Sequence, residues 1–259
     1  IKVIAKPGTG VLKLDGTDVD NNDQLSKSNL DSNKLVFHPV ANGNGDPYTS
    51  FTFKANDGSA DSDATYTMTI DVSAVNDKPT GTSATITINE DTLFTFSVAS
   101  FGYTDIDSDA IDHVLIAAKP GSGQLKNDGS NVNNNDQITK SNLDANKLVF
   151  HPAANANGDP YTTFTFKTND GSVNSDATYT MTIDVSSVND NPTGSSSTVT
   201  LNEDTLFTFA TSAFGYADTE SDTLDHIKVI AKPGTGVLKL DGADVDNNDQ
   251  LSKSNLDST

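Results

Sequence analysis

Residues 84–98 read ATITINEDTLFTFSV, with apolar and polar side chains alternating on both sides of a short acidic turn. Alternation with a period of two places successive side chains on opposite faces of a β-strand, so the stretch predicts strands at 84–88 and 93–98. Similar runs rich in Thr, Val, Ile, Phe and Tyr follow, separated by Gly, Asn, Asp and Pro. They predict further strands at 113–118, 147–151, 162–167 and 177–185.

The spacing of these strands predicts the architecture. Six or seven short strands in about 110 residues, with no amphipathic helical pattern, are typical of an antiparallel β-sandwich with Greek-key connections. The apolar residues of the strands are expected to face the core between the two sheets. They are Phe94, Phe96, Val114, Ile116, Leu125, Leu148, Phe150, Phe164, Phe166, Met181 and Ile183.

The whole unit repeats with a period of 113 residues. Residues 1–77 match 114–190 at 57 of 77 positions without a gap, and 227–259 match 1–33 at 31 of 33. A fixed period of this length indicates one domain per repeat, arranged in tandem. The sequences DKPTG at 77–81 and DNPTG at 190–194 mark the expected boundaries. We therefore expect a partial repeat without its N-terminal strands (1–77), a complete repeat (78–190) and a partial repeat without its C-terminal strands (191–259).

The composition excludes several classes of function. The chain has no cysteine, so disulfides and thiol chemistry are excluded. It carries 36 Asp and Glu against 16 Lys and Arg, a net charge of −20 that would repel nucleic acid. Only three of the acids are Glu, and the Asp residues cluster around the boundaries, which favours calcium, a hard cation bound by oxygen. No apolar run is long enough to span a membrane, and no signal peptide is visible.

The acidic residues recur in a fixed order around each boundary. Around the first, the sequence reads VNDKP at 75–79, NED at 89–91 and DIDSD at 105–109. Around the second, VNDNP at 188–192 is followed by NED at 202–204 and DTESD at 218–222. In these motifs the chain resembles cadherin repeats, and more closely the bacterial cadherin-like repeats of large secreted adhesins. The resemblance covers the whole chain and implies a cadherin- or immunoglobulin-like sandwich with calcium bound at each junction.

The resemblance also implies a set of calcium ligands at each junction. Near residue 77 the implied ligands are Asp57, Asn76, Asp77, Asp105 and Asp107. Near residue 190 they are Glu90, Asp170, Asn189, Asp190, Asp218 and Glu220. The Asp-Arg-Glu element of animal cadherins is absent, and the Asn-Asp-Gly turn at 56–58 is its proposed substitute. The linker is also poorer in acid and amide than the fullest cadherin form, so one or two ions per junction are expected.

Three functions remain open. The leading one is a calcium-stiffened spacer of a giant extracellular bacterial adhesin, secreted or held at the cell surface, whose partners are adjacent repeats and a surface glycan or protein. The second is a filament or sheath in which the C-terminus of one copy completes the N-terminal sandwich of the next by strand addition. The third is a carbohydrate-binding module, which the lack of Trp disfavours. No nucleophile elbow or phosphate loop is present, so we do not expect an enzyme.

Overall fold

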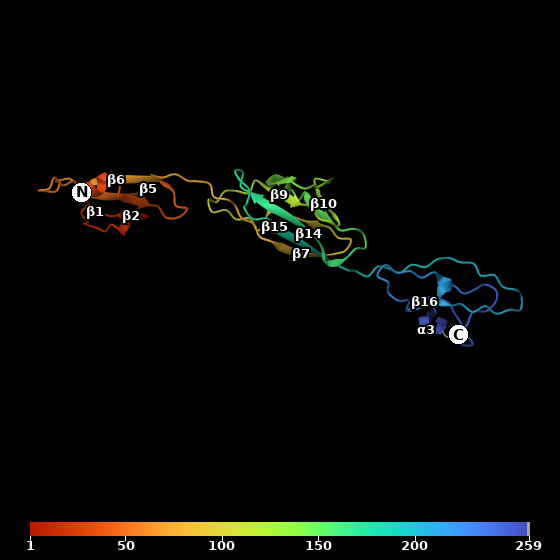
Figure 1. The fold of residues 1–259 in the computed structure, drawn as a ribbon. Coiled ribbons are helices and arrows are strands. Elements are labelled where there is room, and N and C mark those ends of the chain that lie inside the picture. Colours follow the sequence, from red (N-terminus) through yellow and green to blue (C-terminus); the bar gives the residue numbers. More distant parts are fainter. Residues whose placement is uncertain (258–259) are drawn as a thin grey trace.

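The structure is a computed structural model that describes residues 1–257. Three bodies follow one another along the chain in an extended row (Figure 1). Each contains its own cluster of buried apolar residues, and the largest lies between residues 96 and 185. The architecture is all-β, as predicted, with strands in several sheets and only short helices.

The middle body, residues 78–190, is a sandwich of a five-stranded and a four-stranded sheet. The five-stranded sheet has the order β12 (Gln137–Thr139), β9 (His113–Ala118), β14 (Gly158–Asn169), β15 (Tyr179–Ser186), β7 (Ala84–Asn89). The four-stranded sheet has the order β11 (Ser130–Asn131), β10 (Gln124–Asn127), β13 (Leu148–His151), β8 (Phe94–Thr95). The strand pairs are antiparallel, with the exception of β15 and β7, which are parallel.

The core of the middle body lies between these sheets and follows the predicted alternation. Phe164 and Phe166 point inward from β14, and the ring of Phe96 meets that of Phe164 edge-on at 5.5 Å between centroids. Of the predicted core residues, Phe94 alone is half-buried and the others are buried. A strand with one face in the core buries every second side chain, which is why alternation located these residues.

The predicted strand at 93–98 is shorter than expected. After β8, Ser97 begins the 3-10 helix η1 (Val98–Phe101), which Gly102 ends with a left-handed φ of 56°. The helix brings Phe101 into the core, where its ring lies 4.9 Å from that of Phe166. Phe101 therefore joins the core from a helix, beyond the end of the strand.

The first body, residues 1–77, has two three-stranded sheets. Their orders are β1 (Lys2–Ala5), β5 (Gly45–Lys54), β6 (Tyr66–Val72) and β3 (Thr17–Asp18), β2 (Val11–Leu14), β4 (Leu35–His38). Val3, Leu12, Val19, Leu25 and Phe51 form its core. In residues 1–77 the sheets end at β6 and β4.

The third body has little ladder pairing in the residues described. β16 (His226–Lys228) pairs with β19 (Gln250–Ser252), and β17 (Lys239–Leu240) pairs with β18 (Ala243–Asp244). The 3-10 helix η2 (Thr211–Phe214) lies against α3 (Lys253–Asp257). Val245, Leu251 and Leu256 form the small core.

Each body also contains a five-residue helix that the sequence reading did not predict. They are α1 (Lys27–Asp31), α2 (Lys140–Asp144) and α3. Ser26 and Thr139 cap the first two by accepting a hydrogen bond from the backbone N–H three residues on. Among residues 1–257, none of the helices has the length and apolar character needed to cross a membrane.

Candidate metal centre at the junctions

The loop between η1 and β9 gathers three carboxylates. Oxygen atoms of Asp105, Asp107 and Asp109 all lie within 4.8 Å of one another. Asp105 Oδ1 accepts hydrogen bonds from the backbone N–H groups of Asp107 (2.9 Å) and Asp109 (3.1 Å). Ser108 adopts a left-handed φ of 67°, which turns the chain back and keeps the three side chains together.

The linker is held against this loop. Asp77 N donates to Asp107 Oδ2 at 2.6 Å, and Asn76 Nδ2 donates to Asp170 Oδ2 at 3.0 Å. Lys78 forms an ion pair with Asp176 at 2.5 Å. Three successive linker residues therefore contact the body that follows them.

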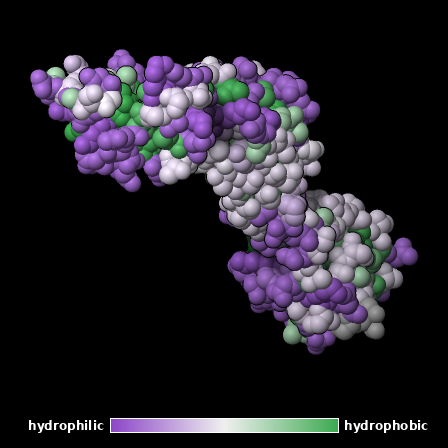
Figure 2. All heavy atoms as spheres, turned by 60° about the vertical axis from the view of Figure 1, so that its left-hand side comes forward, coloured by the Kyte–Doolittle hydropathy of each residue, from purple (hydrophilic) through white to green (hydrophobic). Residues whose placement is uncertain are grey.

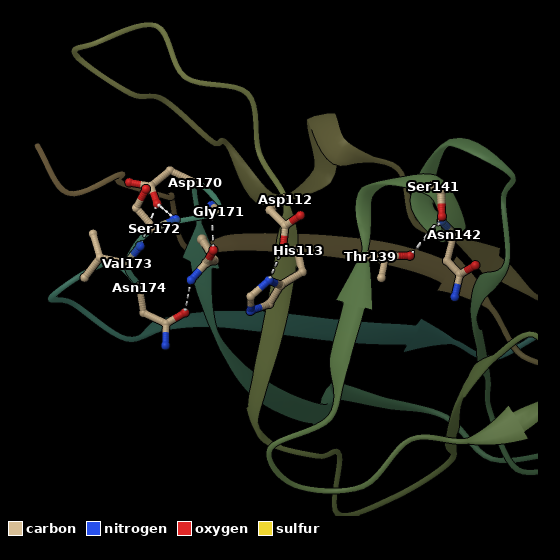
Figure 3. A network of polar contacts seen from close by, with 11 residues as sticks. Asp112, His113, Thr139, Ser141, Asn142, Asp170, Gly171, Ser172, Val173 and Asn174 are labelled. Carbon is tan, nitrogen blue, oxygen red and sulfur yellow. Dashed lines mark hydrogen bonds and ion pairs between the residues drawn. The ribbon is translucent and has the colours of Figure 1, made fainter. Parts of the chain in front are cut away.

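Asp170 lies in a tight turn at the same end of the middle body. Its Oδ1 accepts from the N–H groups of Ser172 and Val173, both at 2.7 Å (Figure 3). Burial acts to raise the pKa of Asp170, but the hydrogen bonds from Asn76 and from the backbone outweigh it, so the pKa lies below its ordinary value. The geometry therefore favours the ionised carboxylate.

The pKa of Tyr103 is sensitive to the negative charge at this end of the middle body. Its hydroxyl donates to the carbonyl oxygen of Asp109 at 2.9 Å. Burial, followed by the charges of Asp105, Asp170 and Asp109, raises the pKa of Tyr103 to about 12. Carboxylates from two separate loops thus act on a single phenol.

The junction near residue 190 has a related arrangement. Glu90, only 3% exposed, accepts a hydrogen bond from Val188 N through Oε1 at 2.6 Å. Asp190 N donates to Glu220 Oε2 at 3.0 Å, the counterpart of the bond between Asp77 and Asp107. Asp218 Oδ1 accepts from Asp222 N at 2.9 Å. In residues 1–257, the three carboxylates at 218, 220 and 222 do not converge as tightly as those at 105, 107 and 109.

Buried oxygens without partners test whether a cation fits these junctions. Asp105 Oδ2, Glu90 Oε2 and Asp190 Oδ2 are buried and have no hydrogen-bond partner among the described residues. A buried carboxylate oxygen without a donor is costly unless a cation neutralises it. Carboxylate oxygens are the ligands that calcium prefers, so the donor sets fit that ion.

Two of the implied ligands lie elsewhere than the resemblance suggested. It placed Asp170 at the junction near 190, whereas the contact with Asn76 places it at the junction near 77. Asp57 is the equivalent residue of the first body, and its turn precedes β6 while the linker follows β6. A seven-residue strand is about 23 Å long, so Asp57 lies at the end of its body far from residue 77.

The other implied ligands lie at or beside the linkers to which they were assigned. Asn76 and Asn189 each donate to the carbonyl oxygen of the next residue at 2.8 Å, and their side-chain oxygens remain available as ligands. Asp109 was absent from the implied set, although the Asp-x-Asp-x-Asp spacing at 105–109 carries the signal for it.

The fold and the junctions define an all-β protein with an acidic cluster where successive bodies meet. Comparison with protein-family models and with curated proteins found no match to this chain.

Proposed function

We propose that the chain is a calcium-stiffened spacer, in which ions bound at the linkers fix the angle between successive sandwiches. The observation that carries the proposal is the convergence of Asp105, Asp107 and Asp109 beside the linker residue Asp77. Without a cation these charges repel one another, so the junction opens; with one, the same oxygens become a shared coordination shell.

The adhesin role rests on the tandem repeat and on the resemblance to bacterial cadherin-like repeats. Tandem domains that repeat at 113 residues provide length and stiffness rather than a single reactive site. The resemblance to bacterial cadherin-like repeats suggests an extracellular protein that projects a binding tip from the cell surface. In this reading the spacer has no catalytic activity and its immediate partners are the neighbouring repeats.

Small-angle scattering of the chain tests the proposal. The profile is recorded with chelator and with roughly 1–5 mM calcium, which covers the affinities of typical extracellular modules. Calcium is expected to convert a flexible particle into a rod of fixed length. An unchanged profile would contradict the proposal.

Matched variants tie the effect to the junction. Asp105→Asn combined with Asp107→Asn should remove most of the calcium response, because amides retain the shape but lose the charge. Asp128→Asn is the control. Asp128 is exposed and lies away from the linkers, and its carboxylate forms an ion pair with Lys147 at 2.9 Å. Equal loss in both variants would show that calcium acts through overall charge rather than through this cluster.

A further inference from the structure

A β-bulge at the start of β14 places an Asp-Pro peptide bond opposite a partly buried carboxyl group. The strands β14 and β15 lie side by side in the middle body (Figure 1), and their register shifts between Gly158 and Thr162. The three residues between them, 159–161, therefore lie opposite the single residue Asp184. The bend is tight, because a Cβ atom on Gly158 would lie 3.2 Å from the Cα atom of Tyr161.

The carboxyl groups of Asp159 and Asp184 meet at this bulge and share a hydrogen bond. Asp184 Oδ1 is buried and has no hydrogen-bond donor among residues 1–257. Burial, followed by the charge of Asp159, raises the pKa of Asp184. On its other side Asp184 is paired with Thr87 of β7, which brings no charge. Two carboxyl groups in contact hold one proton between them, and here Asp184 holds it.

The surroundings of the pair also favour a bound proton. Asp159 and Pro160 are exposed, so water reaches the peptide bond. In the part of the chain that the structure describes, neither Asp159 nor Asp184 forms an ion pair with a cation. The chain carries a net charge of −20, and Figure 2 shows hydrophilic residues over much of the face drawn. A negative potential attracts protons, so it adds to the effect of the bulge.

We propose that the bond between Asp159 and Pro160 is a self-cleavage site, at which Asp159 is the nucleophile and Asp184 the acid. One carboxylate oxygen of Asp159 attacks the carbonyl carbon of its own residue and closes a five-membered cyclic anhydride, while the C–N bond to Pro160 breaks. The proton of Asp184 passes to the Pro160 nitrogen, which leaves as a secondary amine. Water then opens the anhydride and Asp184 takes up a proton again, so the net reaction is hydrolysis of one peptide bond.

The residue types suit this reaction. An Asp side chain reaches its own carbonyl carbon through a five-membered ring, and the proline nitrogen carries no hydrogen and is readily protonated as it leaves. Cleavage would give fragments 1–159 and 160–259. The ladders of β14 with β9 and β15 continue beyond residue 160, so the two fragments stay together until the protein is unfolded. Each chain performs the reaction once, and it does not depend on calcium at the junctions.

Mass spectrometry of the denatured protein tests the cleavage. The full chain is incubated from about pH 4 to 7, where a carboxyl group with a raised pKa titrates, and fragments ending at Asp159 and beginning at Pro160 are expected. The same incubation in concentrated urea measures the hydrolysis that the dipeptide undergoes without the bulge. The folded chain should cleave roughly a hundredfold faster, and its rate should fall as pH rises through the pKa of Asp184. Equal rates in the folded and unfolded chain, or no fragments at any pH, would overturn the proposal.

Three variants assign the roles. Asp184→Asn keeps the shape but has no proton to transfer, so cleavage of the folded variant should fall to the rate of the wild type in urea. Asp159→Asn removes the nucleophile and should abolish the two fragments. Asp128→Asn, which changes an exposed carboxylate away from the bulge, should cleave like the wild type. Thermal unfolding checks that each variant is folded, and a folded Asp184→Asn that cleaves at the wild-type rate would refute the assignment of the acid.

Discussion

Three consecutive residues determine how the first linker meets the middle body. Asn76, Asp77 and Lys78 contact Asp170, Asp107 and Asp176, each through a different type of group. The Lys78 pair is exposed and contributes little, roughly 0–1 kcal/mol. The two hydrogen bonds to carboxylates are charge-assisted and fix the linker more firmly. The linker is therefore part of the candidate metal centre, because its own amides orient the ligands.

Glu90 allows a prediction at a single side chain. Its Oε2 is buried without a partner, so Glu90→Gln should stabilise the chain in chelator by about 1 kcal/mol, because the variant no longer buries a charge. In calcium the same variant should bind the ion at the junction near 190 roughly tenfold more weakly. Chemical denaturation and calorimetric titration of dilute protein measure the two effects.

Glu203→Gln is the matched control for this prediction. Glu203 occupies the equivalent position in the third body, where it is exposed. Its substitution should change neither stability nor calcium affinity. If Glu203→Gln weakened calcium binding as much as Glu90→Gln, the burial of Glu90 would not be the cause.

His151 gives a pH prediction away from the junctions. Burial, followed by the charge of Lys126, lowers the pKa of His151 below 6.5. The neutral imidazole is therefore favoured by folding, and this contribution to stability is present above pH 6.5 and is lost as pH falls through the folded-state pKa. NMR titration should show His151 protonating below its ordinary pKa, and Lys126→Ala should move that pKa part of the way back. A pKa at or above 6.5 in the wild type would contradict the assignment.

At the scale of elements, equivalent positions on β15 and β6 predict different costs for the same substitution. Met181→Ala should lower the free energy of unfolding by about 2–5 kcal/mol, because Met181 is fully buried between the two sheets of the middle body. Met68→Ala should cost well under half as much, since Met68 on β6 is half-exposed. Denaturant unfolding of dilute protein measures both. Equal costs would contradict the assignment of the difference to burial.

The strands were predictable from sequence because their signal is local. Alternation located β7, β9, β13 and β15 within two residues at each end. The parallel pairing of β7 with β15 was not predictable, since it depends on residues almost 100 positions apart. The helix α2 was not predicted, because five residues are too few to show a helical period. Thr139, a residue type that commonly caps helices, was the one local signal for it.

The candidate site was predictable in composition and less so in location. The Asp-x-Asp-x-Asp loop and the linker residues were expected at the site because the motifs resemble, in their order along the chain, those of bacterial cadherin-like repeats. Asp170 was assigned to the wrong junction, because an Asn-Asp-Gly turn gives no indication of which end of its body it occupies. That information comes from strand direction: the turn joins β14 to β15, and β15 then runs the length of the body to the next linker.

For the whole molecule, the charge of −20 raises the question of whether calcium acts by coordination or by screening. Monovalent salt at 0.15 M screens exposed charges beyond about 8 Å, but the carboxylates at 105, 107 and 109 have oxygens within 4.8 Å. Their repulsion is therefore only partly screened, and stiffening should require an ion that contacts several oxygens at once. Magnesium, which is smaller and gives up its water reluctantly, should act more weakly than calcium.

Scattering at constant ionic strength separates these mechanisms at the scale where they matter, the length of the chain. Profiles in calcium, in magnesium and in sodium chloride of equal ionic strength are compared with the profile in chelator. Calcium alone should produce the full rod-like length, because its flexible shell of six to eight oxygens suits the irregular set of carboxylate and amide oxygens of the linker and the body that follows it. If sodium chloride produced the same length, the acidic clusters would act only as repelling surface charge, and the stiffness of the array would not depend on bound metal.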